Sequence, residues 1–196
     1  MVPFKIPAFF LLRLMLIYAV LALAWLVVGD SYRTGFHQAG VWSFDGRSDS
    51  ISVSFLPFEN TASGDPDTLI QLRVPDRKRP KKVRCSSRIL GYAPTVVLLA
   101  LVVASPISRW RRLWASILGV LLVCAFVEVR VGLLLLDAAS DVKVEMITLS
   151  PWVKSLVGTL AKLAARIPSG YVVPVFIWMI VAFRAKDWVR IANREL

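Results

Sequence analysis

The sequence has little of what metal centres and catalytic clusters are built from. Its 196 residues include one histidine, His37, and two cysteines, Cys85 and Cys124. A single histidine leaves no His-rich set of metal ligands, and no nucleotide-binding motif is present, so we predict no cofactor. Cys124 falls inside an apolar block whereas Cys85 precedes another, and this difference in depth predicts two free thiols rather than a disulfide.

Acidic residues are also scarce. The chain has 13 Asp and Glu against 24 Lys and Arg, for a net charge of +11. In a soluble protein this excess would suggest nucleic acid, but here the basic residues flank apolar segments. Anionic lipid headgroups and topology signals account for them there, so we predict contact with anionic lipids and no binding of nucleic acid.

What the chain has in abundance is apolar sequence, which makes up 57% of it. The excess collects in blocks close to the about 20 residues that a helix needs to cross a bilayer. We predict about four membrane-spanning helices, at Ala8–Val28, Ile89–Ile107, Leu113–Leu136 and Tyr171–Phe183. The first is longer than a signal-peptide core and lacks a convincing small-x-small cleavage site, which favours a retained anchor.

Residues 29–88 lack such a long apolar block, and their pattern predicts a small β-rich domain outside the membrane. Gly40–Phe44 and Arg47–Phe55 flank Asp45-Gly46, a signal for a two-residue hairpin turn. Apolar and polar residues alternate in Arg47–Phe55 and again in Thr68–Val74, as in half-buried strands. We therefore expect a three-stranded antiparallel meander, too small to be stable alone, that rests on the membrane surface or on a partner.

A basic stretch follows this domain and leads into the second span. It is either a solvated, headgroup-contacting stop before a helix or a docking patch for an acidic partner or anionic lipid. With two tryptophans, its side chains are our candidates for partner or lipid contact: Arg77, Lys78, Arg79, Lys81, Lys82, Arg84, Trp42 and Trp152.

Residues 137–168 predict a loop followed by an amphipathic helix. Ser150-Pro151 is typical of an N-cap with proline in the first helical position, and apolar residues from Trp152 to Ile167 fall at helical spacing. This helix either lies in the interface plane or packs on the β-rich domain as a short soluble helix. The chain thus divides into an anchor (1–28), the β-rich domain (29–88), a helical hairpin (89–136), this segment (137–168), and a fourth span with a basic tail (169–196).

The orientation rests on the basic residues around the first helix. Lys5 and Arg13 precede or begin it, and Asp30 and Arg33 follow it, which favours a cytoplasmic N-terminus. The bare count of Lys and Arg favours the opposite orientation, but most of that excess lies in a loop of about 60 residues, where the rule fades. We predict a multi-pass protein of the inner or cell membrane, with cytoplasmic termini and residues 29–88 and 137–168 outside.

Glu128 and Arg130 are the ionisable residues that lie well inside a predicted span. A charge in hydrocarbon costs several kcal/mol unless it is paired or faces protein. Two positions apart on a helix, the side chains point in different directions and pair poorly with each other. Three roles remain open: polar contact between helices, a proton or substrate site, or contact with another subunit.

Three short segments resemble the core of the exosortases, a family of membrane cysteine peptidases and transpeptidases. They are Arg84–Gly91, Ser108–Leu113 and Val127–Val131. In that family a cysteine begins one membrane helix, an Asn-x-x-Arg motif ends the next, and a histidine opens the one after. The resemblance implies Cys85 as nucleophile and Arg130 as its stabilising arginine. However, Val127 stands in place of the asparagine, and no histidine follows Cys85. The arrangement is also similar to small membrane proteins that accompany exosortases.

The sequence therefore predicts an all-α integral membrane protein with a small antiparallel β insertion and an interfacial amphipathic helix. The function that it favours is a non-catalytic accessory or scaffold subunit that contacts other membrane protein subunits. Two alternatives stay open: an exosortase-like enzyme that uses Cys85 and Arg130, and a small proton-coupled carrier that uses Glu128.

Overall fold

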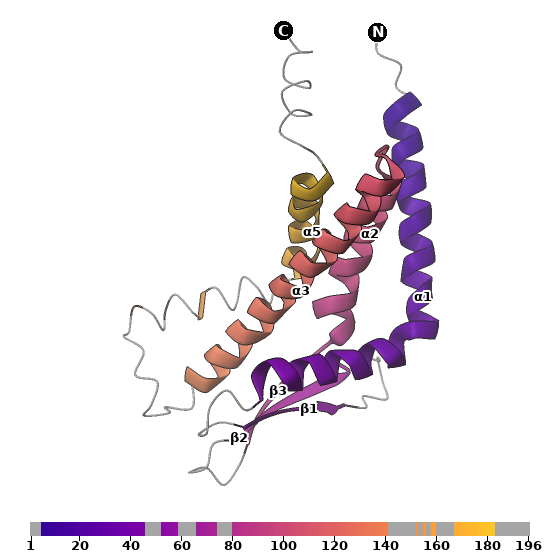
Figure 1. Ribbon diagram of the computed structural model, residues 1–196. Coiled ribbons are helices and arrows are strands. Elements are labelled where there is room, and N and C mark those ends of the chain that lie inside the picture. Colours follow the sequence, from indigo (N-terminus) through magenta and orange to yellow (C-terminus); the bar gives the residue numbers. More distant parts are fainter. Residues whose placement is uncertain are drawn as a thin grey trace.

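The computed structural model describes residues 5–45, 52–58, 66–73, 80–140, 152, 155, 158, 159 and 167–182. Within them the chain is mostly helical and carries one three-stranded antiparallel sheet of order β1-β2-β3 (Figure 1). The elements are α1 (Lys5–Phe44), β1 (Ser52–Pro57), β2 (Thr68–Arg73), β3 (Lys81–Cys85), the π-helical turn η1 (Arg88–Tyr92), α2 (Ala93–Ala104), α3 (Arg109–Ser140) and α5 (Ile167–Ala182).

Among the residues that the structure describes, two helices, rather than the four predicted, are long and apolar enough to cross a bilayer: Phe9–Phe44 and Arg109–Ala138. The apolar helices Arg88–Ala104 and Gly170–Ala182 are shorter. The first of these ends where it does because Ser105 adopts an extended conformation, ψ 138°, which is the conformation that Pro106 imposes on the residue before it. Over the described part of the chain, hydropathy alone therefore overestimated the number of full-length spans.

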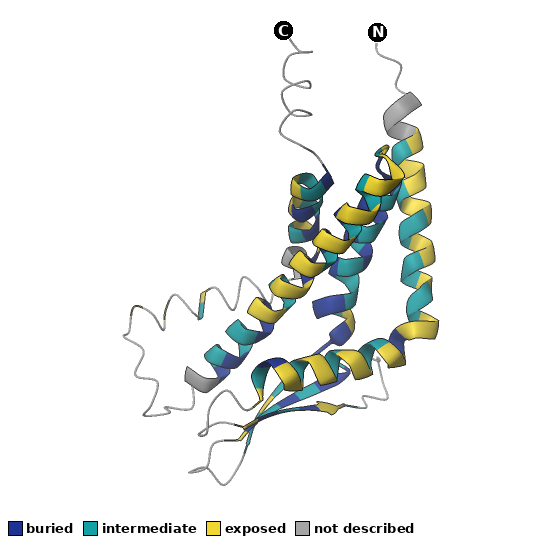
Figure 2. Ribbon diagram, in the orientation of Figure 1, coloured by how far each residue is buried: buried dark blue, intermediate teal, exposed yellow. Residues whose placement is uncertain are grey.

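The helices form a bundle in which α2 is packed between its neighbours. It lies beside α3 and α5 (Figure 1). Its buried face meets them in one apolar cluster, whose buried members are Leu98, Val102, Ala115, Val123 and Ile177. The outer faces of α1 and α3 are largely exposed (Figure 2). The start of α1 and the end of α5 lie at the same end of the bundle, opposite the sheet.

Helix α1 does not end at Val28 but continues to Phe44, so the predicted strand Gly40–Phe44 is wrong. Its first part stands in the bundle. Its second part, which includes Arg33 to Phe44, lies across the sheet (Figure 1). Phe36, Gly40 and Phe44 recur at every fourth residue, so they share one face of the helix. That face packs on Phe55 of β1, with ring centroids 6.4 Å away for both phenylalanines. Burial of this face outweighs the weak helix propensity of the glycine.

The sheet is the predicted three-stranded meander, but its third strand is a different segment. β2 falls inside the predicted strand Thr68–Val74, whereas β1 overlaps the predicted Arg47–Phe55 and extends two residues beyond it, to Pro57. Val53, Phe55, Ile70 and Leu72 point to the buried side, as their alternation predicted. The third strand is β3, which was predicted to belong to a basic stretch outside the sheet and instead pairs with β2, Ile70 opposite Val83. Charged residues at an edge are a common device against unwanted strand pairing, and here they masked the strand signal.

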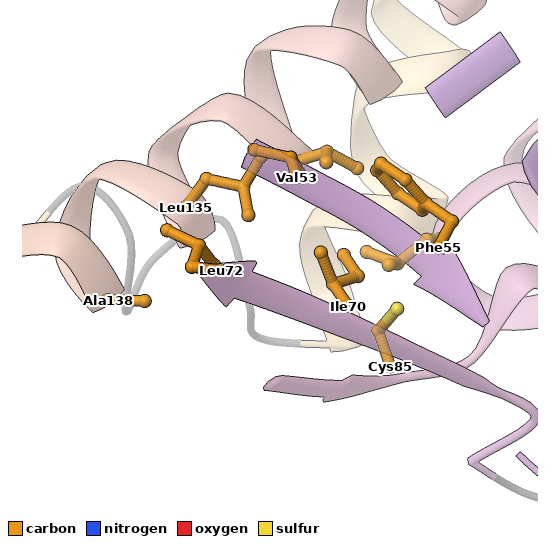
Figure 3. Packing of buried hydrophobic residues seen from close by; sticks show 9 residues of the cluster. Val53, Phe55, Ile70, Leu72, Cys85, Leu135 and Ala138 are labelled. Carbon is orange, nitrogen blue, oxygen red and sulfur yellow. The ribbon is translucent and has the colours of Figure 1, made fainter. Parts of the chain in front are cut away.

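The apolar face of the sheet is covered by the chain's own helices. It forms one cluster with Val131, Leu135 and Ala138 from the end of α3, which extends beyond the predicted limit at Leu136 (Figure 3). Phe36 and Phe44 of α1 pack against the same cluster. Intramolecular packing therefore buries the apolar face of the sheet. That the meander rests on the membrane surface or on a partner stays a prediction.

The predicted amphipathic helix falls largely outside the described residues. Trp152, Ser155, Gly158 and Thr159 are described, and all four are helical. The hydroxyl of Thr159 donates to the carbonyl oxygen of Ser155 at 2.9 Å, one turn earlier. Where this segment lies relative to a bilayer stays a prediction.

Candidate functional site

The carboxylate of Asp67 is the centre of a buried polar network where the sheet meets the helices. Asp67 stands immediately before β2 and is 4% exposed. Its Oδ1 accepts hydrogen bonds from the backbone N–H of Ser87 at 2.8 Å and from the Thr68 hydroxyl at 2.9 Å. Its Oδ2 accepts one from the Ser87 hydroxyl at 2.6 Å. A buried carboxylate with three donors is well compensated, so Asp67 fixes the start of β2 to Ser87, the residue before η1.

Helix α1 joins this network from its second part. Nε2 of His37 lies 3.0 Å from Oγ1 of Thr68, and Nε of Arg33 lies 3.7 Å from Oδ2 of Asp67. Because the Thr68 hydroxyl gives its hydrogen to Asp67, the bond from His37 is donated by Nε2, which fixes the imidazole tautomer. Polar and apolar contacts therefore hold the same part of α1 on the sheet.

The segment Ser86–Ser87 supplies the turn from β3 into the helices. Oγ of Ser86 accepts from the backbone N–H of Ile89 at 3.3 Å, as a helix N-cap does. The first turns are π-helical, with the N–H of Ala93 bonded to the carbonyl oxygen of Arg88. The wider turn accommodates Pro94, which has no N–H and whose ring would crowd a regular α-helical carbonyl.

Cys85, the candidate nucleophile, ends β3 with its thiol in the apolar cluster (Figure 3). Burial, followed by the negative charge of Asp67, raises the pKa of this thiol to about 12. The thiolate is the reactive form of cysteine, so this environment opposes nucleophilic chemistry at neutral pH. Both cysteines are free, as the sequence predicted.

Arg130, the second candidate, is buried in α3 with 1% of its surface exposed. Its guanidinium lies 5.9 Å from the ring of Phe126 and against Gly170 of α5. A Cβ added at Gly170 would lie 3.4 Å from Nη1 of Arg130 and 3.6 Å from the carbonyl oxygen of Ile89. Arg130 therefore sits where α3, α5 and η1 converge, the position expected of a polar contact between helices.

Glu128 lies elsewhere, on the wall of a groove between the second part of α1 and α3. Its Oε1 accepts a hydrogen bond from the buried Ser43 hydroxyl at 3.3 Å. The groove has a volume of about 280 Å³ and a mostly apolar lining. The side chains of Glu128 and Arg130 thus point to different surroundings, as their spacing predicted.

The predicted contact residues have varied environments. Trp42 on α1 is 85% exposed and Trp152 is 70% exposed. Lys81, Lys82 and Arg84 belong to β3, and Arg84 stacks over Phe58 at 4.9 Å. The other three basic residues, Arg77, Lys78 and Arg79, lie outside the described residues.

Sequence reasoning missed Asp67, Thr68, Ser87 and His37 as a connected set. A local signal existed in Ser86-Ser87 ahead of an apolar helix, which is typical of a helix start. The association with Asp67, twenty residues away from Ser87, depends on strand pairing and on the continuation of α1. No pattern along the chain predicts it.

No protein-family model matches the chain, and neither a curated protein nor a solved structure matches it.

Proposed function

We propose that this chain is a membrane-embedded, non-catalytic accessory or scaffold subunit of a larger membrane protein complex. The observation that carries the proposal is the unpartnered apolar surface of α1 and α3. None of the most apolar 18-residue stretch of α1 is buried, and 22% of the corresponding stretch of α3 is. A soluble core helix would be mostly covered, so these faces require lipid or partner helices.

The side chains available for chemistry support an accessory role over an enzymatic one. The Cys85 thiol points into an apolar cluster, and its raised pKa opposes thiolate formation. The polar groups around Asp67 bond to one another and join α1, β2 and η1. The Asp67 network, the best-organised polar cluster of the described residues, therefore supports a structural role.

The sheet region suits contact outside the bilayer. Its edge strand β3 exposes Lys82 and Arg84, and Trp42 stands exposed on the neighbouring part of α1. Aromatic and arginine side chains are frequent energetic centres of protein interfaces, and basic side chains attract anionic headgroups. We therefore place the partner contacts of the subunit at this end and along its exposed helices, with this end on the outer side of the membrane.

Extraction of native membranes with a lipid-retaining polymer, followed by mass measurement of single particles, tests the proposal. We expect the tagged chain in a discrete, reproducible species heavier than itself, with Cys85→Ala behaving like the wild type. Recovery of the chain solely as a monomer would contradict the proposal. If Cys85→Ala keeps the complex but abolishes cleavage of a co-expressed sorting-signal protein, the exosortase-like alternative is correct instead.

A further inference from the structure

The groove between the second part of α1 and α3 has unfilled space along its α1 wall. Its α1 wall includes Gly35, where an added Cβ would meet no atom within 4 Å, and Ala39 one turn later. Its α3 wall includes Val127 and Glu128. It is therefore an apolar depression with small residues on one side and one carboxylate on the other.

The carboxylate of Glu128 has little compensation within the described residues. Ser43 bonds one oxygen, Oε1, through a neutral hydroxyl. The salt bridges in the described part of the chain join Arg33 to Asp30 and to Asp67, and Glu128 takes part in neither. The exposed Glu128 also lies inside the apolar stretch Arg109–Ala138, so in the proposed membrane setting an unpaired charge there is costly.

We propose that this groove receives one transmembrane helix of a partner subunit, and that a single Lys or Arg of that helix pairs with Glu128. The inference rests on the proposed function, because it names the surface and the chemistry of the contact. Charge complementarity selects this occupant. A lipid acyl chain would fill the apolar space but offers neither a cation nor a donor. A headgroup ammonium is tied to a phosphate that would repel the carboxylate. An apolar helix fills the apolar space, and a basic side chain on it supplies the cation and the hydrogen-bond donor for Glu128.

Model helices in lipid nanodiscs test the pairing directly. The full chain, labelled with a fluorescent donor, is placed in phosphatidylcholine discs with acceptor-labelled 20-residue Leu-Ala transmembrane peptides. One peptide carries a central Lys, and its control carries Leu there. Polar contacts between helices in membranes imply that the Lys peptide associates about 3- to 20-fold more tightly. In Glu128→Gln this preference should disappear, while the Leu peptide is unaffected.

A steric pair of variants locates the binding. Gly35→Trp fills the open groove and should abolish association of both peptides. Thr34→Trp is the matched control, because Thr34 is exposed, adjacent in sequence and not part of the groove lining. It should bind as the wild type does. Equal binding of the two peptides, a Lys preference that survives Glu128→Gln, or insensitivity to Gly35→Trp would each overturn the proposal.

Other occupants give distinct results that also overturn it. Immobilisation of a spin-labelled acyl chain that Gly35→Trp abolishes, with no peptide association, would mean that lipid fills the groove. Energy transfer between copies of the chain that Gly35→Trp abolishes would mean that a second copy does. If the native complex forms unchanged in Glu128→Gln and Gly35→Trp, the groove assignment fails while the accessory function stands. Recovery of the wild-type chain solely as a monomer from native membranes refutes the function itself.

Discussion

Replacement of Gly40 by alanine tests whether α1 is held on the sheet by close packing. A Cβ at Gly40 would lie 2.7, 2.7 and 2.9 Å from three ring atoms of Phe55, which is buried and shares its cluster with Ile70 and Val131. Such overpacking typically costs about 1–3 kcal/mol. The same substitution improves helix propensity by about 1 kcal/mol, which partly offsets the cost.

Gly35→Ala separates the two contributions. Gly35 lies on the same part of α1, where an added Cβ meets open space, so this variant gains the propensity without the clash. We expect it to be more stable than Gly40→Ala by about 1–3 kcal/mol, the cost of the clash alone. Phe55→Leu, which shortens the ring that causes the clash, should reduce the penalty of Gly40→Ala in the double variant.

The assay is reversible denaturant unfolding of the full chain in mild detergent, with the rate of limited proteolysis as a second readout. Gly40→Ala should unfold at lower denaturant and be cleaved faster than Gly35→Ala. Equal stability of the two alanine variants would refute the inference that Phe55 packs against the backbone of α1.

Three further predictions concern the polar and aromatic contacts. Asp67→Asn should lower the free energy of unfolding by about 1.5–3 kcal/mol, because three hydrogen bonds lose their charged acceptor. The exposed control Asp30→Asn should change it by less than about 1 kcal/mol, and similar effects for the two variants would contradict the network. The Cys85 thiol should resist a maleimide at pH 7.5 and react once denaturant is added, because a pKa near 12 lowers its thiolate fraction about a thousandfold. Rapid labelling of Cys85 in the native chain would disprove its burial. Trp178→Phe should lower the free energy of unfolding by about 0.5–1.5 kcal/mol, since its indole N–H donates to the buried Ser105 hydroxyl at 2.8 Å. An unchanged midpoint of thermal unfolding would argue against this link between α5 and the end of α2.

The sequence by itself determined the elements that depend on local patterns. Long apolar blocks predicted the bundle part of α1 and most of α3 as helices, because each block has about the length and the apolar composition of a helix that crosses a bilayer. Alternation placed Val53, Phe55, Ile70 and Leu72 on the inner face of the sheet, because side chains alternate along a strand. The unpaired state of both cysteines likewise followed from their positions.

Contacts between distant segments decided the rest. Residues 40–44 precede the hairpin-turn signal Asp45-Gly46 and were predicted as a strand, yet they are helical because Phe55 packs against the face that contains Gly40. The charged β3 is a strand because β2 offers it a backbone partner and the cluster offers a place for Cys85. Asp67 meets Ser87, and Glu128 faces α1, only after these elements have assembled. Local propensities differ by fractions of a kcal/mol per residue, whereas burial of one large apolar side chain contributes about 1.5–3 kcal/mol, so packing overrides the local pattern where the two disagree.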